Sequence, residues 1–497
     1  MENDDLNLDP TKFSADEGKD SVWVPSDPPS QKLISSENKP EKILRRRNNN
    51  NRPLIDKFSR YIITSIEEVE KLVEECASSN RDVAYHAVLN LRLHLCSKYE
   101  LYLDKLFQTD VKYNAAWALA YFASGDSHHT LFLIKESVIT ALCSLLRDLN
   151  PSLVEQSIWA LSNIIADGPI AREFVLSLNL LSALNQPLYL HYKSIPLIKH
   201  ISWMLINICT RKQIDVPIEY VPQIIPILDV LLTNTDEIIL DDVLTSIVYL
   251  ADSSSKHVSL LIESGIVDKV YKFLGVSQRF TINALRVIGC IAASIEEHTQ
   301  YLLDHGILFH LQPLLNSKNK KVKKQLYWVL SNFAAGTRSQ MLALFSLNIF
   351  PQIIKDLEEG IYAVRREACL VICNIIHEGT YQEVQQFIES DVLYFMRIFL
   401  ETQDNHMIVA ILKVVVILLR LYSANNSHKY MCNKIEESGV LHCINKLQAG
   451  SAEYIRFWTA HILEKHFSKD MEKDVKNENI SHDDQSGLSS AAYKYVF

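Results

Sequence analysis

Glycine is scarce in this chain, and closely spaced cysteine pairs are missing. Only 13 of 497 residues are glycine and 48% are hydrophobic, a balance that favours a mostly helical protein with a large core. None of the nine cysteines forms a CxxC pair. Cys369 and Cys373 would share a helical face, but no second pair completes a zinc site. We therefore expect buried reduced thiols, no bound metal and an intracellular protein.

The sequence also has no excess of positively charged residues. The formal net charge is −9 at pH 7, whereas nucleic-acid-binding domains are usually strongly basic. We expect no direct nucleic-acid binding and a preference for basic partners. The longest apolar run, Ile408 to Leu419, is interrupted by Lys413 and is too short for a bilayer, so we expect a buried helix and no membrane span. No signal peptide is expected at the start of the sequence.

Known catalytic motifs are also absent. The sequence contains no Walker loop and no GxGxxG, HExxH or GxSxG motif. Its 17 histidines are dispersed, and the pair His128–His129 is expected to be exposed on a loop. We therefore expect neither an enzyme nor a cofactor.

A helix with two contrasting faces is predicted near residues 155–168. Its apolar residues, Ile158 and those spaced from it at helical period, form one face. Trp159 and Asn163 lie four residues apart, so both should point outward from the other, more exposed face. Gly168 is expected to end the helix.

The same pattern recurs along the chain, with tryptophan replaced in some copies. Successive equivalent positions are 42, 44, 42, 41, 42 and 42 residues apart. A period near 42 without long strands is the signature of an armadillo or HEAT array, in which each repeat contacts mainly its neighbours. The equivalent positions are Trp117, Trp159, Trp203, Thr245, Arg286, Trp328 and Leu370.

Each repeat is predicted to contain a short first helix, a second helix and a long third helix. Gly265, Gly306 and Gly439 precede the second helix in three repeats, where a sharp turn requires positive φ. The array is expected over residues 61–467, ending in a capping unit.

Two polar tails flank the array. Residues 1–60 are predicted to be a disordered tail. Residues 1–41 contain ten acidic residues and four lysines, and nothing in them repeats at helical spacing. A basic cluster follows at residues 42–52. On its own this cluster has three interpretations: a nuclear-localisation peptide, a nucleic-acid contact or a solvated linker. Residues 468–497 are predicted to be a second disordered tail.

The third helices would line a concave groove with a ladder of Trp and Asn. An Asn amide carries both a donor and an acceptor, so it can bond the backbone of an extended peptide. Trp rings would form slots for long aliphatic stems and attract cations, and carboxylates such as Asp167 would select ammonium groups. The ligand implied is an extended segment rich in Lys and Arg. The alternative is that the ladder only packs helices together, which leaves the Asn residues unexplained.

The segment Glu155–Gly168 and those around Trp203 and Trp328 resemble the importin alpha (karyopherin alpha) family. Tyr249-Leu250-Ala251-Asp252 and Arg286-Val287-Ile288-Gly289 resemble the family's fourth and fifth repeats, and the resemblance covers about residues 85–467. It implies an all-α armadillo-repeat, right-handed superhelical solenoid of about nine or ten repeats. It also implies an adaptor that carries nuclear-localisation signals.

The resemblance implies two peptide-binding sites. The major site would contain a lysine pocket of Gly125, Thr130 and Asp167, and a ladder of Trp117, Ser124, Gln156, Trp159, Asn163, Trp203 and Asn207. The minor site would consist of Tyr249, Arg286, Trp328, Asn332, Glu367 and Asn374.

Several positions depart from the family's pattern. Tyr121 and Cys290 stand where the family has Asn, and Gln325 stands where it has Glu. Thr245 and Leu370 replace Trp. We expect the major site to bind and the minor site to be weak.

The amino-terminal segment departs most from the family. The family begins with a basic importin-beta-binding domain, of which only Lys42, Arg45, Arg46 and Arg47 have counterparts here. In the family this cluster also folds back into the groove as an autoinhibitor.

The sequence therefore predicts a nuclear import adaptor in the cytoplasm and nucleus. Its expected partners are cargo proteins with basic signals, importin beta, the export receptor that recycles the family and possible nucleoporins. The alternative is an armadillo scaffold, derived from this family, that no longer acts in general nuclear import.

Overall fold

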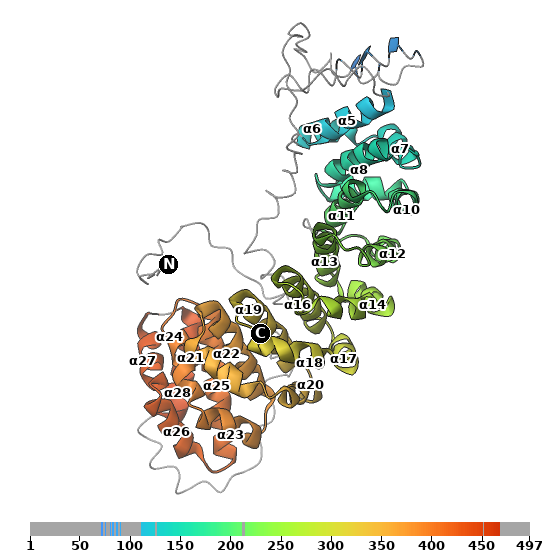
Figure 1. The fold of residues 1–497 in the computed structure, drawn as a ribbon. Helices are drawn as coiled ribbons and strands as arrows, with labels where there is room; N and C mark the ends of the chain where they lie inside the picture. The colour runs from blue at the N-terminus through green and yellow to red at the C-terminus, as the bar shows by residue number, and fades with distance from the viewer. Residues whose placement is uncertain are drawn as a thin grey trace, which may run out of the picture.

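The computed structural model describes residues 111–124, 127–210, 214–450 and 452–467, with scattered positions between 71 and 90. Within these ranges the chain forms α-helices and short 3-10 helices stacked into one curved array (Figure 1). The predicted all-α solenoid is confirmed. The predictions for residues 1–60, for Gly125 and for residues 468–497 lie outside the described residues.

The long third helices form an inner layer along the array (Figure 1). Each packs against the third helix of the next repeat, as far as α28 against α25 at the carboxyl end. These helices are α5 (Val111–Ala123), α8 (Pro151–Ile165), α11 (Ile195–Cys209), α13 (Glu237–Ala251), α16 (Gln278–Ala292), α19 (Lys320–Ala334), α22 (Tyr362–Glu378), α25 (Asn405–Ala424) and α28 (Glu453–His466).

The first and second helices of the repeats cover the outer side of that layer. The first helices are α6 (Ser127–Leu133), α9 (Pro169–Ser177), α14 (Ser255–Glu263), α17 (Glu296–Asp304), α20 (Arg338–Ala343), α23 (Tyr381–Glu389) and α26 (His428–Glu437). The second helices are α7 (Glu136–Leu145), α10 (Leu180–Leu190), α12 (Val221–Leu231), α15 (Ile266–Val270), α18 (Ile307–Leu311), α21 (Phe350–Glu359), α24 (Val392–Leu400) and α27 (Val440–Gly450). Short 3-10 helices adjoin four of them: η2 (Ile218–Tyr220), η3 (Tyr271–Phe273), η4 (Gln312–Asn316) and η5 (Leu344–Leu347).

One continuous apolar core joins the repeats. Ile158, Leu161, Ile164 and Ile165, the predicted apolar face of α8, are at most 1% exposed. Their counterparts in the other third helices belong to the same cluster. Because a single repeat cannot bury its apolar face alone, each repeat depends on its neighbours for stability.

Local chemistry sets where the helices begin. Side chains that accept from the first turn cap several third helices, as Asn150 does for α8 and Asp236 for α13. Gly265, Gly306 and Gly439 have φ of 72°, 72° and 79°, so the predicted left-handed turns before the second helices are confirmed.

Gly168 behaves differently from its prediction. Helix α8 already ends at Ile165, and Gly168 is the residue that precedes α9, with φ of 164°. That backbone is extended and open to any residue, so the left-handed helix end inferred for Gly168 was wrong.

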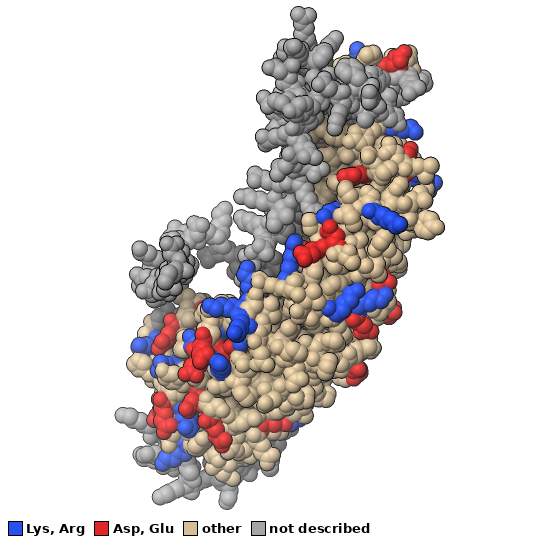
Figure 2. Space-filling view, viewed as in Figure 1, with Lys and Arg blue, Asp and Glu red and all other residues tan. Residues whose placement is uncertain are grey.

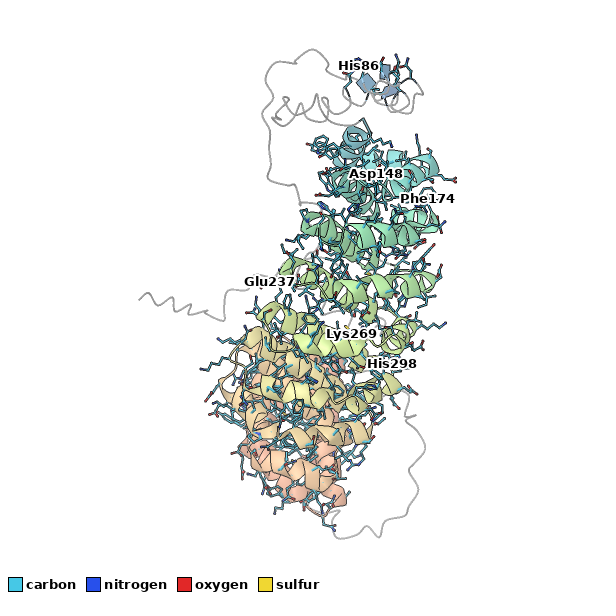
Figure 3. The ribbon with its side chains drawn as sticks, turned by 45° about the vertical axis from the view of Figure 1, so that its right-hand side comes forward. His86, Asp148, Phe174, Glu237, Lys269 and His298 are labelled. Carbon is cyan, nitrogen blue, oxygen red and sulfur yellow. The ribbon has the colours of Figure 1, made fainter. Side chains whose placement is uncertain are left out.

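Polar contacts between consecutive repeats accompany the apolar core. In the outer layer, His257 Nε2 donates to the Val216 carbonyl at 2.8 Å, and His298 Nε2 lies 3.0 Å from Ser259 Oγ. Lys269 Nζ lies 2.6 Å from an Asp229 oxygen. Figure 3 shows Lys269 and His298 away from Glu237, which begins the inner helix α13.

Helix α25 contains the apolar run noted in the sequence. It is the one described helix whose length and composition would suit a membrane span, with 20 residues. In the array it packs against α22, α24, α26 and α28, and 61% of its most apolar window is buried. It therefore serves as a core helix of the array, as predicted.

The repeat after α11 departs from the three-helix pattern. Residues 214–217 are not helical, and α11 leads through them to η2. Arg172 of α9, which is 2% exposed, holds this segment in place. Its guanidinium donates to the carbonyls of Ile208 (3.4 Å), Thr210 (3.1 Å), Ile214 (3.1 Å) and Asp215 (2.9 Å).

We predict that Arg172→Ala lowers the free energy of unfolding by about 3 kcal/mol, because two carbonyls at the end of α11 and two carbonyls of the segment lose their donor. Urea unfolding followed by circular dichroism would measure this loss. Arg338→Ala is the matched control. Arg338 also bonds a carbonyl, that of Glu378 at the end of α22, but its side chain is 43% exposed, so we expect a change below about 1 kcal/mol. Equal losses in the two variants would contradict this role for Arg172.

Candidate groove on the inner helices

The equivalent positions found in the sequence all lie on the inner layer. Each falls near the middle of a third helix, from Trp117 on α5 to Leu370 on α22. A second set lies four residues later, one helical turn along the same face. Its members are Tyr121, Asn163, Asn207, Tyr249, Cys290, Asn332 and Asn374.

Four Asn side chains of the second set bond the preceding inner helix in the same way. Each donates its amide Nδ2 to a main-chain carbonyl 43 or 45 residues earlier. The pairs are Asn163 to Ala120 (2.8 Å), Asn207 to Ser162 (3.2 Å), Asn332 to Gly289 (3.0 Å) and Asn374 to Ser331 (2.8 Å). A carbonyl can only accept, so this bond fixes the amide with its nitrogen toward the preceding helix and leaves Oδ1 and the second N–H for other partners.

Several acceptors along this face have no donor within the described residues. They are Gln156 Oε1 on α8, Asn207 Oδ1 on α11, and Glu367 Oε2 and Asn374 Oδ1 on α22. Asn207, Glu367 and Asn374 are 1%, 1% and 4% exposed. Buried polar atoms without a partner are rare and cost free energy, so these acceptors are a distinctive feature of the inner layer.

The tryptophan rings differ in exposure along the array. Trp117 and Trp159 are partly exposed; Trp117 stacks on Tyr121 with ring centroids 5.5 Å apart, and Trp159 lies 6.4 Å from the His200 ring. Trp203 and Trp328, however, are only 4% and 6% exposed. The outward orientation predicted for these two rings was therefore wrong.

Gly289 explains the burial of Trp328. It lies on α16, and a methyl group built on it would overlap the Trp328 ring. The absence of a side chain at Gly289 lets the ring lie directly on the neighbouring inner helix. Asn332, one turn after Trp328, bonds the Gly289 carbonyl, so one residue positions both members of the pair.

The predicted lysine pocket is partly described. Thr130 lies on α6 and is 2% exposed, and Asp167 follows the end of α8. Helix α6 packs against both α5 and α8, which brings these two segments to the same end of the inner layer. Ser124 Oγ donates to the Tyr121 carbonyl at 2.6 Å. The remaining member, Gly125, lies outside the described residues.

A further carboxylate at the major site was missed by the sequence analysis. Glu155 precedes Trp159 by one turn, and its Oε1 lies 3.4 Å from His200 Nδ1. Burial raises the pKa of Glu155, because the charged carboxylate loses water. The signal was available in the sequence, since position 155 lies four residues before the Trp position of its repeat.

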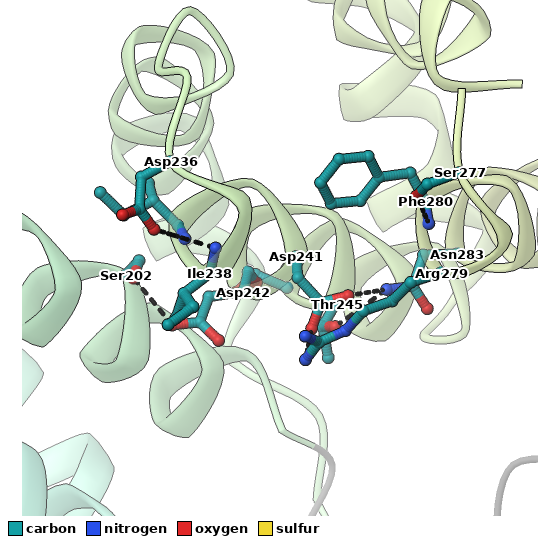
Figure 4. Close-up of polar contacts among 12 residues, drawn as sticks. Ser202, Asp236, Ile238, Asp241, Asp242, Thr245, Ser277, Arg279, Phe280 and Asn283 are labelled. Atoms are coloured by element: carbon teal, nitrogen blue, oxygen red, sulfur yellow. Dashed lines mark hydrogen bonds and ion pairs between the residues drawn. The ribbon is translucent and has the colours of Figure 1, made fainter.

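Polar side chains that the sequence analysis also missed link the inner helices at the centre of the array (Figure 4). Asp242 accepts from Ser202 Oγ at 2.8 Å, which joins α13 to α11. Asp241 accepts from Asn283 Nδ2 at 2.9 Å and pairs with Arg279, which joins α13 to α16. Each of these residues precedes the Trp position of its own repeat: Ser202 by one residue, Asp242 and Asn283 by three, Asp241 by four and Arg279 by seven.

The residues predicted for the minor site lie on α13, α16, α19 and α22. Burial raises the pKa of Tyr249, while the nearby Arg286 opposes this shift. Glu367 is buried beside Arg366, with 2.8 Å between Oε1 and Nη1, and burial raises its pKa despite that partner. Leu370, in place of Trp, is 9% exposed. Among these residues, Asn332 and Asn374 make the same bond to the preceding inner helix as Asn163 and Asn207 do.

Charge divides the inner layer into two parts. Helices α8, α11 and α13 carry four acids (Glu155, Glu237, Asp241 and Asp242) and one lysine (Lys199). Helices α16 and α19 carry six cations and no acid. Figure 2 shows Lys and Arg side chains gathered over α16 and α19 on the hollowed side of the array. The amino-terminal part therefore suits a basic ligand better than the middle of the array does.

Metal ligation and thiol chemistry find no support in the described part of the chain. No group of three or more His, Cys, Asp or Glu residues there could hold a metal ion. The seven described cysteines are free, and burial raises the pKa of Cys209 to about 12 and that of Cys143 to about 11. Such thiols are poor nucleophiles and poor metal ligands.

Comparison with known proteins supports the armadillo architecture. Residues 126–166 match the Armadillo/beta-catenin-like repeat family. The crystal structure of an engineered protein superposes with a TM-score of 0.63 at 21% identity, covering 81% of this chain and 99% of that one. At this identity the likeness concerns the fold alone.

Similarity to curated proteins is more specific. Importin subunit alpha-1b of Oryza sativa subsp. japonica is 31% identical over 229 residues, which cover 46% of this chain and 42% of that protein. Importin subunit alpha-1a of the same plant is 29% identical over 246 residues, or 46% of its length. These alignments span less than half of either rice protein. Importin subunit alpha-4 of Arabidopsis thaliana is 27% identical over 396 residues, covering 78% of this chain and 73% of that protein.

We predict that Gly289→Ala displaces the Trp328 ring and lowers the free energy of unfolding by about 1–3 kcal/mol, as overpacking of a filled core does. Fluorine NMR of fluorotryptophan-labelled protein, with Trp328→Phe to assign the resonance, would detect the displaced ring. Gly168→Ala is the control, because nothing lies within 4 Å of the added methyl group there. An unchanged Trp328 resonance in Gly289→Ala would contradict the close packing.

Proposed function

Because this chain is a divergent relative of the importin alpha subunits, we propose that it is a nuclear import adaptor. It would bind the basic localisation signals of cargo proteins along its inner helices and shuttle between cytoplasm and nucleus. The major site would lie on α5, α8 and α11, with the partly exposed Trp117 and Trp159 as slots beside the buried Trp203, and Asn163 and Asn207 as backbone ligands. Trp328, Asn332, Glu367 and Asn374 would give a weaker second site.

The row of oriented Asn side chains carries this proposal. Their Nδ2 groups are already bonded within the array, and Asn207 Oδ1 and Asn374 Oδ1 have no donor among the described residues. An extended peptide presents main-chain N–H groups along its length, which are donors of the kind these oxygens lack. Bonds to the main chain hold a peptide whatever its side chains, so sequence preference must come from the slots between the rings.

The charges near the major site favour cationic side chains in those slots. Glu155 and Asp167 lie on α8 or just after it, and no basic residue lies on α8 itself. Aromatic faces attract ammonium and guanidinium groups, and the partly exposed rings of Trp117 and Trp159 provide such faces. Lys and Arg therefore fit this half of the groove best.

We predict that the full-length chain binds a fluorescent Pro-Lys-Lys-Lys-Arg-Lys-Val peptide and that Asp167→Lys weakens binding at least about tenfold, or 1.4 kcal/mol. The added ammonium group would repel the lysine that the carboxylate selects. Fluorescence anisotropy gives both dissociation constants.

Glu263→Lys is the matched control, because it makes the same change of charge at an exposed position of the outer helix α14. It should bind like the parent chain. Equal affinities of Asp167→Lys and the parent would contradict the proposed pocket. Failure of the folded parent chain to bind would instead favour the armadillo scaffold that no longer carries cargo.

We also propose that residues 42–52 link the adaptor to importin beta. Replacing Lys42, Arg45, Arg46 and Arg47 together with Ala should abolish capture of the full-length chain by immobilised importin beta, because the cluster supplies the cations of that contact. The same variant should bind the basic peptide at least as well as the parent. Equal capture of parent and variant would count against a role for this cluster, and the export receptor and nucleoporins would then need separate tests.

A further inference from the structure

The two inner helices α16 and α19 form a strongly basic stretch that lies beyond the proposed major site on α5, α8 and α11. We name this stretch, with the lysine that precedes α19, the basic segment of the groove. Its cations are Arg279, Arg286, Lys318, Lys320, Lys321, Lys323 and Lys324.

Some of these cations are matched by acids within the fold. Lys323 Nζ lies 2.7 Å from both carboxylate oxygens of Asp356, and Arg279 pairs with Asp241 while keeping 65% of its side chain exposed. Lys318, Lys320 and Lys321 are exposed. The structure gives these three lysines no ion pair with a described residue, so their charge is directed to solvent.

Helix stability does not account for this arrangement. Lys320 and Lys321 occupy the first turn of α19, where the helix dipole is positive and acids are favoured. Lysines there oppose the dipole and add to its field. Asn319 supplies the N-cap for α19, with its Oδ1 accepting from Lys321 N at 3.0 Å, so the lysines are not needed as caps.

The basic segment also fits a basic peptide poorly. A localisation signal extended past α13 would meet cations on two successive helices that carry no acid of their own. The position expected to carry Glu in this part of the groove is Gln325, so the charge that would offset these cations there is missing. The ligand that complements this stretch is an extended segment rich in Asp and Glu.

We propose that the basic segment binds residues 1–41 of this same chain, which carry ten acids and four lysines. The tail is long enough to reach the basic segment. Helix α19 lies five inner helices beyond α5, which is about 40–50 Å at the usual helix spacing. A flexible chain of 41 residues has an average end-to-end distance of about 35 Å and can extend to roughly 135 Å. A tethered segment whose length matches the span has a high effective concentration at its site.

The order of charges supports this pairing. Traced backwards from the array, the chain presents the basic cluster at residues 42–52 first and the acidic residues 1–41 afterwards. Along the inner layer from α8, the acidic helices come first and the basic segment afterwards. A tail running along the groove in this direction would place each charge against its opposite. The acidic contact does not require that cargo bind the major site.

The test uses a full-length chain in which the ten tail acids are changed to Asn or Gln, which we call the neutral-tail chain. A fluorescein-labelled peptide of residues 1–41 should bind this chain at low salt and lose most of its affinity at about 0.5 M NaCl, as exposed charges are screened. The double change Lys320→Glu and Lys321→Glu in the neutral-tail chain should weaken binding at least about tenfold. Lys320→Gln and Lys321→Gln should give an intermediate loss.

Lys429→Glu with Lys446→Glu, at exposed positions of the outer helices α26 and α27, is the matched control and should leave the peptide's affinity unchanged. The unaltered chain should bind the free peptide at least about tenfold more weakly than the neutral-tail chain, because its own tail competes. Equal affinities of these two chains would overturn the tail as the occupant and favour an acidic segment of another protein. Unchanged affinity after the Lys320 and Lys321 substitutions would overturn the site itself.

The same variants separate this proposal from the cargo site. Asp167→Lys should reduce binding of the basic peptide and leave binding of the acidic peptide unchanged. If only the acidic peptide fails to bind, the adaptor proposal is still supported. If only the basic peptide fails to bind, the proposal for the basic segment is still supported.

Discussion

The bond from an Asn side chain to the carbonyl of the preceding repeat is the contact on which the groove depends. It fixes the distance and register of neighbouring inner helices through Asn163, Asn207, Asn332 and Asn374. It uses one N–H of the amide, so that Oδ1 and the second N–H remain for other partners. The ladder therefore packs the inner helices together, whereas its binding of a peptide stays a prediction.

The apolar core sets the spacing between neighbouring inner helices, and the polar contacts determine which polar groups the inner layer exposes. Each inner helix buries residues such as Ile158 and Leu161 against both neighbours, which keeps the helices in a single row. Where a repeat loses its first helix, after α11, the buried Arg172 replaces helix packing with bonds to main-chain carbonyls. The array can thus tolerate an irregular repeat while its inner layer stays continuous.

The sign of the charged side chains changes along the inner layer. Acids predominate from α8 to α13, and cations replace them on α16 and α19. Asp241 on α13 connects these parts through Asn283 and Arg279 on α16, while Asp242 joins α13 to Ser202 on α11 (Figure 4). A uniform groove would accept one kind of peptide along its whole length. Here the acids lie toward one end of the inner layer and the cations lie in its middle.

The sequence by itself determined the repeat, its period near 42, the apolar faces and the ladder positions, because these depend on local spacing along each helix. It could not determine which rings stay accessible. Trp203 and Trp328 are buried although their spacing matches that of Trp159, and for Trp328 the cause is Gly289, a residue 39 positions earlier on another helix. The tertiary structure likewise decided the orientation of the Asn amides. It also decided the contact of Glu155 with His200 and the bonds of Arg172 to main-chain carbonyls. Each joins atoms from different repeats, and a pattern within one helix carries no information about such contacts.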